Sequence, residues 1–120
     1  MILVVTDDQR WDTLAYMPTV QRELVGRGVK FKNAFAVNPL CCPSRASILT
    51  GTYSHTNGVW ANSGQYGGFH VFRDRSTLPA WLDAAGYETM LIGKYLNGYP
   101  LRSVCRDFVS VLGRVGPSFI

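Results

Sequence analysis

Residues 41–51, CCPSRASILTG, combine a potential sulfur nucleophile with a helix start and an arginine one turn later. Pro43 has the backbone angle suited to a first helical position, and Gly51 suits a helix end, so a helix is predicted over residues 43–50. Arg45 comes four residues after Cys41 and can project back over it. Unpaired N–H groups at the helix start and the forked arginine donors favour an anion. We therefore predict an oxyanion-binding site with a sulfur nucleophile or its derivative.

The adjacent Cys41 and Cys42 also have plainer interpretations. Free cysteine is among the most buried residue types, so the pair could be two small core residues. A zinc site is disfavoured, because no second pair of Cys or His stands at finger-like spacing. Three cysteines, two of them adjacent, do not form the pattern of a disulfide framework. The residue types alone leave the anion site and the buried pair open.

The pattern Cys-x-Pro-Ser-Arg-x-x-x-Leu-Thr-Gly at residues 41–51 resembles the signature of the type I sulfatases, in which the first cysteine is converted to formylglycine. With the downstream GKYLN at residues 93–97, the chain is most similar to the N-acetylglucosamine-6-sulfatase and related arylsulfatase branch, over about residues 2–100. The resemblance implies a sulfuric ester hydrolase and part of an alkaline-phosphatase-like α/β sandwich, with a mainly parallel sheet flanked by helices. Only Cys41 stands two residues before Pro43 and four before Arg45, so it is the residue expected to be modified.

Asp7 and Asp8 follow an apolar run at residues 2–5, which is typical of a strand covered on both faces. Such a pair is more often a solvated turn or a helix cap. Both carboxylates can serve one site only if the chain turns just after Val5, and paired carboxylates then suit a hard cation. The resemblance implies Asp7, Asp8 and the modified Cys41 as metal ligands, with Ca²⁺ favoured over Mg²⁺.

Four further segments make up the scaffold that the sequence predicts. Residues 17–25 carry a helical apolar stripe, and residues 29–35 alternate like a half-buried strand. Residues 77–85 indicate an amphipathic helix with Thr77 as its cap, and residues 87–93 a following strand. A helix followed by a strand is consistent with a parallel sheet.

Lys94 falls at the carboxyl end of that last predicted strand. A lysine there is usually an exposed charge, but the resemblance implies that it contacts a sulfate oxygen, which makes Cys41, Arg45 and Lys94 the catalytic set. Many sulfatases have His two residues after this lysine, where this chain has Leu96. The acid or base role of that histidine is unfilled here unless Asn97, or a residue outside this chain, takes part of it.

The resemblance also implies a mechanism and partners. One hydroxyl of hydrated formylglycine at position 41, activated by the cation and held by Arg45, would attack sulfur and release the ester's alcohol, while Lys94 and the cation would offset charge on the sulfuryl oxygens. The second hydroxyl then expels sulfate and regenerates the aldehyde. The implied partners are a sulfate ester, either an aryl sulfate or a sulfated sugar, and a formylglycine-generating enzyme or its equivalent.

Composition bounds these interpretations. A chain of 120 residues with 47% hydrophobic content is one domain at most. The net charge of +4 without a basic run gives little support for nucleic acid, and no apolar run approaches the roughly 20 residues that span a bilayer. No signal peptide precedes the first predicted strand, although the family is often exported or lysosomal.

The domain organisation expected is an N-terminal part of a sulfatase catalytic domain over residues 1–100, followed by a tail over residues 101–120 without family resemblance. A truncated gene model or a shifted reading frame is one hypothesis for this tail. The family's later ligands lie in sequence that is absent here, so little activity is expected of the chain alone. Two alternatives stay open: a phosphonate or phosphate monoester hydrolase of the same superfamily, and a non-catalytic α/β binding module with an unmodified, buried cysteine pair.

Overall fold

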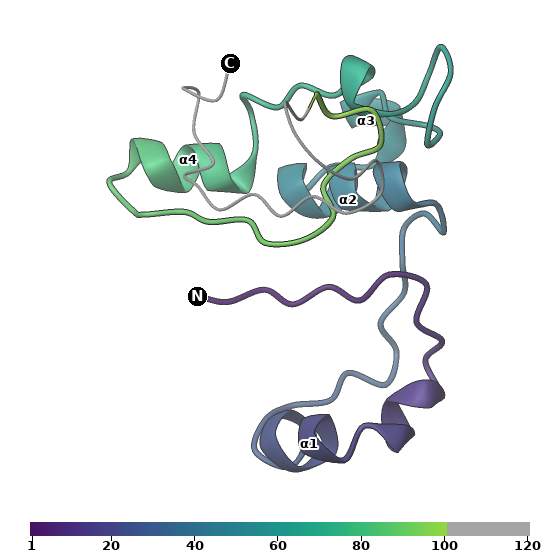
Figure 1. The fold of residues 1–120 in the computed structure, drawn as a ribbon, viewed down its shortest axis with the longest axis vertical. Coiled ribbons are helices and arrows are strands. Elements are labelled where there is room, and N and C mark those ends of the chain that lie inside the picture. The colour runs from purple at the N-terminus through teal and green to yellow at the C-terminus, as the bar shows by residue number, and fades with distance from the viewer. Residues whose placement is uncertain (101–120) are drawn as a thin grey trace. The chain divides into compact units, whose positions relative to one another are not determined.

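The computed structural model describes residues 1–100 and divides the chain into two compact units, Met1–Phe35 and Ala36–Ile120 (Figure 1). The predicted tail at residues 101–120 lies outside the described residues. The two units differ in side-chain packing: the first has no buried residue, whereas the second has a buried core.

The first unit contains a 3₁₀ turn and, after the non-helical Met17, a helical segment. A 3₁₀ turn at Thr13–Tyr16 leads into α1 (Pro18–Val20), and the chain continues as a π-helical turn, Gln21–Val25. The last hydrogen bond of the π-helical turn runs from the Gly26 N–H to the Gln21 carbonyl oxygen, at 2.9 Å. The helix predicted over residues 17–25 is therefore confirmed, with Pro18 at the first position, where its missing N–H is not needed. No residue of this unit is buried.

The strands predicted at residues 2–5, 29–35 and 87–93 are not formed in the described part of the chain. Within residues 1–100 the only β pairing is an isolated bridge between Ala61 and Gly67. A strand exists through hydrogen bonds to a neighbour, and an apolar run without one stays exposed, as Ile2 (91%) and Val4 (75%) do. The expected mainly parallel sheet is thus not confirmed within these residues.

The second unit is built around α2 (Cys41–Thr50), which packs against α3 (Ser54–Asn57) and α4 (Leu78–Ala84) (Figure 1). A 3₁₀ turn at Phe69–Val71 lies between α3 and α4 in the chain. The end predicted for α2 is confirmed: Gly51 adopts φ +67° and its N–H donates to the Ser47 carbonyl oxygen at 2.9 Å. The helix begins two residues earlier than predicted, at Cys41.

The predicted helix after Thr77 is confirmed as α4, with Thr77 in the position before its first turn. The Thr77 side chain does not cap the helix, however. Its hydroxyl donates to the Asp74 carbonyl oxygen at 3.2 Å. Taken over residues 1–100, every helix is too short or too polar to cross a membrane.

The core of the second unit joins α2 to residues 94–97, which we call the Lys94 segment. Six side chains form it: Cys42, Ala46, Val59, Phe72, Tyr95 and Leu96. Cys42 and Ala46 lie one turn apart on α2 and so share a face. The Tyr95 ring makes edge-on contacts with Phe72 and Tyr99, with ring centroids 6.3 and 5.1 Å apart. Packing of this face therefore holds the Lys94 segment against α2.

Candidate active site

The first turn of α2 separates its two cysteines by environment. Cys41 is partly exposed, whereas Cys42 is fully buried, and both are free thiols. Leu40, in the preceding extended position, has no side-chain acceptor for the helix N–H groups. The Cys42 N–H donates instead to Oδ1 of Asn62 at 2.9 Å. The buried-core interpretation therefore describes Cys42 and leaves Cys41 accessible for chemistry.

Cys42 has hydrogen-bond partners on two other segments. Its Sγ accepts the Asn97 N–H at 3.1 Å, and its thiol donates to the Asn62 carbonyl oxygen at 3.8 Å. Burial raises the pKa of the Cys42 thiol, an effect that the Asn97 hydrogen bond partly offsets. Cys42 therefore stays a protonated, structural thiol at neutral pH.

Arg45 and Lys94, 49 residues apart in the sequence, meet in the structure. Nη1 of Arg45 donates to the Lys94 carbonyl oxygen at 2.6 Å. Arg45 also lies one helical turn after Cys41, on the same face of α2. Cys41, Arg45 and Lys94 thus belong to one packed unit, and the arginine connects the helix to the Lys94 segment.

The Lys94 segment is fixed on both sides of the lysine. Gly93 adopts φ +109°, a conformation that side-chain-bearing residues rarely adopt, so the chain can change direction just before Lys94. After it, the Tyr95 hydroxyl donates to the Asp74 carboxylate, and the Asn97 carbonyl oxygen accepts the Phe69 N–H at 2.8 Å. Burial, together with the Asp74 hydrogen bond, raises the pKa of Tyr95. The tyrosine therefore remains a donor over the physiological range.

Asp7 and Asp8 belong to the first unit, in a bend with both side chains exposed. Asp8 adopts φ +53°, in the left-handed region that Asp tolerates better than most residues. The chain therefore turns after the apolar run, which is the condition that two adjacent carboxylates need in order to serve one site. Two carboxylates of this kind are the donor type that a hard cation prefers.

Sequence reasoning missed the residues that support this arrangement. Asn62 lies in a polar, glycine-marked loop, and Asp74 in a turn before α4. Asn97 acts through its backbone N–H and C=O groups, which no side-chain pattern can reveal. Asn62 and Asp74 belong to no motif, and Asn97, although it ends the GKYLN motif, contributes contacts that only the folded chain identifies.

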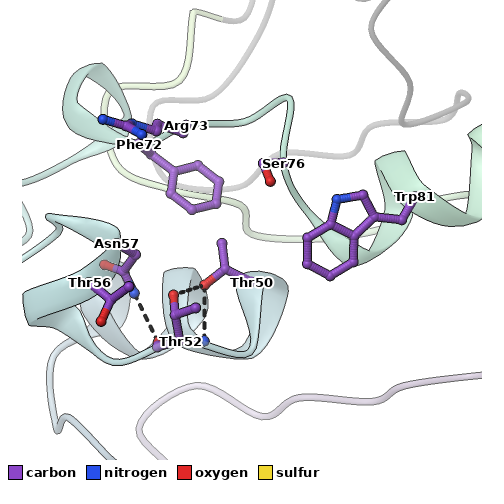
Figure 2. A pocket seen from close by; sticks show the side chains of 8 residues that line it. All are labelled: Thr50, Thr52, Thr56, Asn57, Phe72, Arg73, Ser76 and Trp81. Carbon is purple, nitrogen blue, oxygen red and sulfur yellow. Dashed lines mark hydrogen bonds between the residues drawn. The ribbon is translucent and has the colours of Figure 1, made fainter.

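A separate hollow of about 210 Å³ lies at the opposite end of α2, around Thr50 (Figure 2). Its polar groups bind one another: the Thr50 and Thr52 hydroxyls are 2.7 Å apart, and the Asn57 amide donates to the Thr52 carbonyl oxygen at 3.0 Å. Its lining residues are Thr50, Thr52, Thr56, Asn57, Phe72, Arg73, Ser76 and Trp81. None of the candidate catalytic residues lines it, so the hollow is not the site predicted at Cys41.

Comparisons with known proteins agree with the signature. The sulfatase family model matches residues 1–118. An extracellular sulfatase SULF-1 homolog of Drosophila melanogaster is 41% identical over 106 residues, which cover 82% of this chain and 9% of that protein. The N-acetylglucosamine-6-O-sulfatase of Bacteroides thetaiotaomicron is 37% identical over 102 residues, covering 79% and 17%.

The human N-acetylglucosamine-6-sulfatase is 38% identical over 107 residues, covering 82% of this chain and 19% of that protein. The chain therefore spans between 9% and 19% of the length of these three relatives. No solved structure matches the chain.

Proposed function

The chain belongs to the sulfatase family. We propose that its residues act in the hydrolysis of sulfate esters, with formylglycine formed from Cys41 as the source of the nucleophile. One observation carries this proposal above the others. The first turn of α2 leaves Cys41 accessible, buries Cys42 and connects Arg45 to the Lys94 segment at 2.6 Å. A modifiable residue, a forked cationic donor and a lysine are therefore held by one packed unit.

Each residue of this set has a distinct role in the proposed reaction. Formylglycine at position 41 supplies, when hydrated, a hydroxyl nucleophile for sulfur. The Arg45 guanidinium orients an anionic group at the start of α2, where backbone N–H groups and the helix dipole add positive potential. Lys94 offsets charge on the sulfuryl oxygens as the ester bond breaks. The anchoring of the arginine to the lysine backbone supports this division, because it limits how far the two cations can move apart.

A cation site is the second part of the proposal. Asp7, Asp8 and the modified residue 41 would hold Ca²⁺, which when bound supplies Lewis-acid stabilisation of a sulfuryl oxygen. The bend at Asp8, with its φ of +53°, supports the use of both carboxylates in one site. Ca²⁺ is favoured over Mg²⁺ because it accepts more oxygen ligands in a more flexible geometry.

The fold proposed for the complete site is an alkaline-phosphatase-like α/β sandwich with a mainly parallel sheet. The apolar runs at residues 2–5 and 87–93 are proposed as strands of that sheet. Apolar side chains of these runs are exposed here, such as Ile2 at 91% and Ile92 at 71%. A parallel sheet is normally covered on both faces, so forming one would bury these side chains, which supports the proposal.

The proposed substrate is a sulfated sugar or an aryl sulfate. Relatives of the chain are named N-acetylglucosamine-6-sulfatase and arylsulfatase. The net charge of +4 also suits an anionic ester. A formylglycine-generating enzyme is the partner that the modification requires.

The proposal is tested by transplanting residues 1–100 into the aligned region of the Bacteroides thetaiotaomicron relative and expressing the chimera with a formylglycine-generating enzyme. We expect Ca²⁺-dependent release of sulfate, with kcat/KM for an aryl sulfate above that for the matched phosphate ester. Arg45→Ala and Lys94→Ala should each lower kcat by about 10²-fold or more. A folded chimera whose turnover survives Cys41→Ala, or that prefers the phosphate ester, would contradict the proposal.

A further inference from the structure

The start of α2 is capped by a residue that is distant in sequence. Residues with a side-chain acceptor are preferred at the position before the first turn of a helix, but in α2 that position is Leu40. Oδ1 of Asn62, twenty residues later, accepts the Cys42 N–H at 2.9 Å. Asn62 therefore performs for α2 the function that Ser or Asp normally performs locally.

Asn62 is presented to the helix by a closed loop. The Trp60 N–H donates to the Tyr66 carbonyl oxygen at 2.7 Å, and the Gly68 N–H donates to the Ala61 carbonyl oxygen at 3.0 Å. A Cβ atom on Gly68 would lie 3.0 Å from the Asn97 carbonyl oxygen and 3.2 Å from that of Asn62. Because position 68 is glycine, its backbone can lie close to the Asn62 carbonyl group of the same loop and to the Asn97 carbonyl group.

The Cys42 side chain connects this loop to the Lys94 segment. Its Sγ accepts the Asn97 N–H at 3.1 Å while its thiol faces the Asn62 carbonyl oxygen at 3.8 Å. The residue is fully buried, so the Asn97 N–H would lose a protected acceptor if the sulfur were removed. A protonated thiol can donate and accept together, and its sulfur also packs well in an apolar core.

Two hydrogen bonds therefore run from the first turns of α2 to the segment that begins at Lys94. Arg45 binds the Lys94 carbonyl oxygen, and Cys42 binds the Asn97 N–H three residues further on. Two separate points fix both the distance and the direction of a short segment, whereas a single point would leave it free to pivot.

From this geometry we propose that Asn62 and Cys42 are positioning residues, which hold the first turn of α2 and the Lys94–Asn97 segment in one fixed arrangement. Neither residue is proposed to touch the substrate. Asn62 sets the start of the helix that carries Cys41, and Cys42 sets the place of the segment that carries Lys94. The catalytic consequence rests on the proposed function, but the arrangement itself does not.

The proposal is tested on the 120-residue chain by residue-resolved amide hydrogen exchange. In Asn62→Ala we expect exchange at the Cys42 amide to accelerate about tenfold, because its acceptor is lost while the core remains. Asn62→Asp keeps an acceptor oxygen and should restore slow exchange. Gln65→Ala, in the exposed part of the same loop, is the matched control and should change neither Cys42 nor Asn97.

The cysteine is tested by a second pair of variants. Cys42→Ala should accelerate exchange at the Asn97 amide about tenfold, and Cys42→Ser, which keeps an acceptor, should do so less. Unchanged exchange at Asn97 in Cys42→Ala would overturn the proposal. So would equal behaviour of Asn62→Asp and Asn62→Ala, or an acceleration spread evenly over residues 36–100, which would indicate general unfolding.

In the chimera that tests the sulfatase proposal, Asn62→Ala should lower kcat with little change in KM, and Asn62→Asp should recover kcat. A change in KM alone would contradict the positioning role. Because the exchange measurements need no turnover, an inactive chimera would count against the proposed function and leave the positioning result standing.

Discussion

The two units of the chain carry residues implied in the same site, but they hold them by different means. In Met1–Phe35 no side chain is buried, and the Asp7-Asp8 pair lies in a backbone bend. In the described part of the second unit, Cys42 belongs to a buried core that also includes two residues following Lys94. Tertiary packing thus positions the proposed catalytic residues, whereas local backbone conformation shapes the proposed metal ligands.

The contrast is also one of apolar surface. The first unit exposes a run of aliphatic side chains, including Ile2, Leu3 and Val4, which contribute nothing to stability while they stay in water. In the described part of the second unit, Phe72 and Tyr95 are buried in one cluster with Cys42 and Ala46 of α2. Single substitutions should therefore have large effects in one unit and small effects in the other.

The largest difference is expected between two phenylalanines. Phe72 is 7% exposed and contacts Tyr95, whereas Phe35 is 88% exposed. Phe72→Ala should lower the free energy of unfolding by about 3 kcal/mol. Phe35→Ala should change it by less than about 0.5 kcal/mol. Urea unfolding followed by tryptophan fluorescence measures both, and equal effects would remove the distinction between the units.

An intermediate effect is expected for two arginines. Arg45 donates to the Lys94 carbonyl oxygen from a partly buried position, whereas Arg22 forms an exposed ion pair with Glu23. Arg45→Ala should cost about 1.5 to 2 kcal/mol of unfolding free energy, because a charged hydrogen bond is lost. Arg22→Ala should cost less than about 0.5 kcal/mol. If high salt reduced the Arg45 effect as strongly as the Arg22 effect, the partly buried contact would not be what stabilises the protein.

The smallest expected effect is a loss of stability in alkali. Burial and the Asp74 hydrogen bond raise the pKa of Tyr95 above its ordinary value of 10.0, so the folded tyrosine stays protonated while the unfolded one ionises. Unfolding then releases a proton, and its free energy should fall by about 1 kcal/mol between pH 10 and 11.

This alkaline slope should decrease in Tyr95→Phe, since the buried titrating group is gone. Tyr16→Phe, which changes an exposed tyrosine of the first unit, controls for the loss of one hydroxyl. Unfolding curves recorded at several pH values give the slope, and an equal slope in wild type and Tyr95→Phe would rule out this source.

What the sequence predicted well depends on neighbours along the chain. Gly51 ends α2 because a glycine accepts the left-handed conformation, and the apolar spacing after Thr77 predicts α4. The sequence predicts the start of α2 two residues too late, because Asn62 rather than a local residue supports its first turn.

What the sequence did not predict depends on partners far along the chain. The Cys42 sulfur meets an N–H 55 residues away, and Arg45 meets a carbonyl group 49 residues away. The expected strands fail for a related reason: an apolar run such as residues 2–5 becomes a strand only where a neighbouring strand accepts its hydrogen bonds, and none is present among residues 1–100.

Peptide mass spectrometry can distinguish an accessible, modifiable Cys41 from a buried Cys42. The chain is co-expressed with a formylglycine-generating enzyme, with Cys41→Ala as the control. We expect a mass loss at position 41 that corresponds to replacement of the thiol by an aldehyde, together with an intact thiol at position 42. An unmodified thiol at Cys41, or modification at Cys42 in its place, would contradict it.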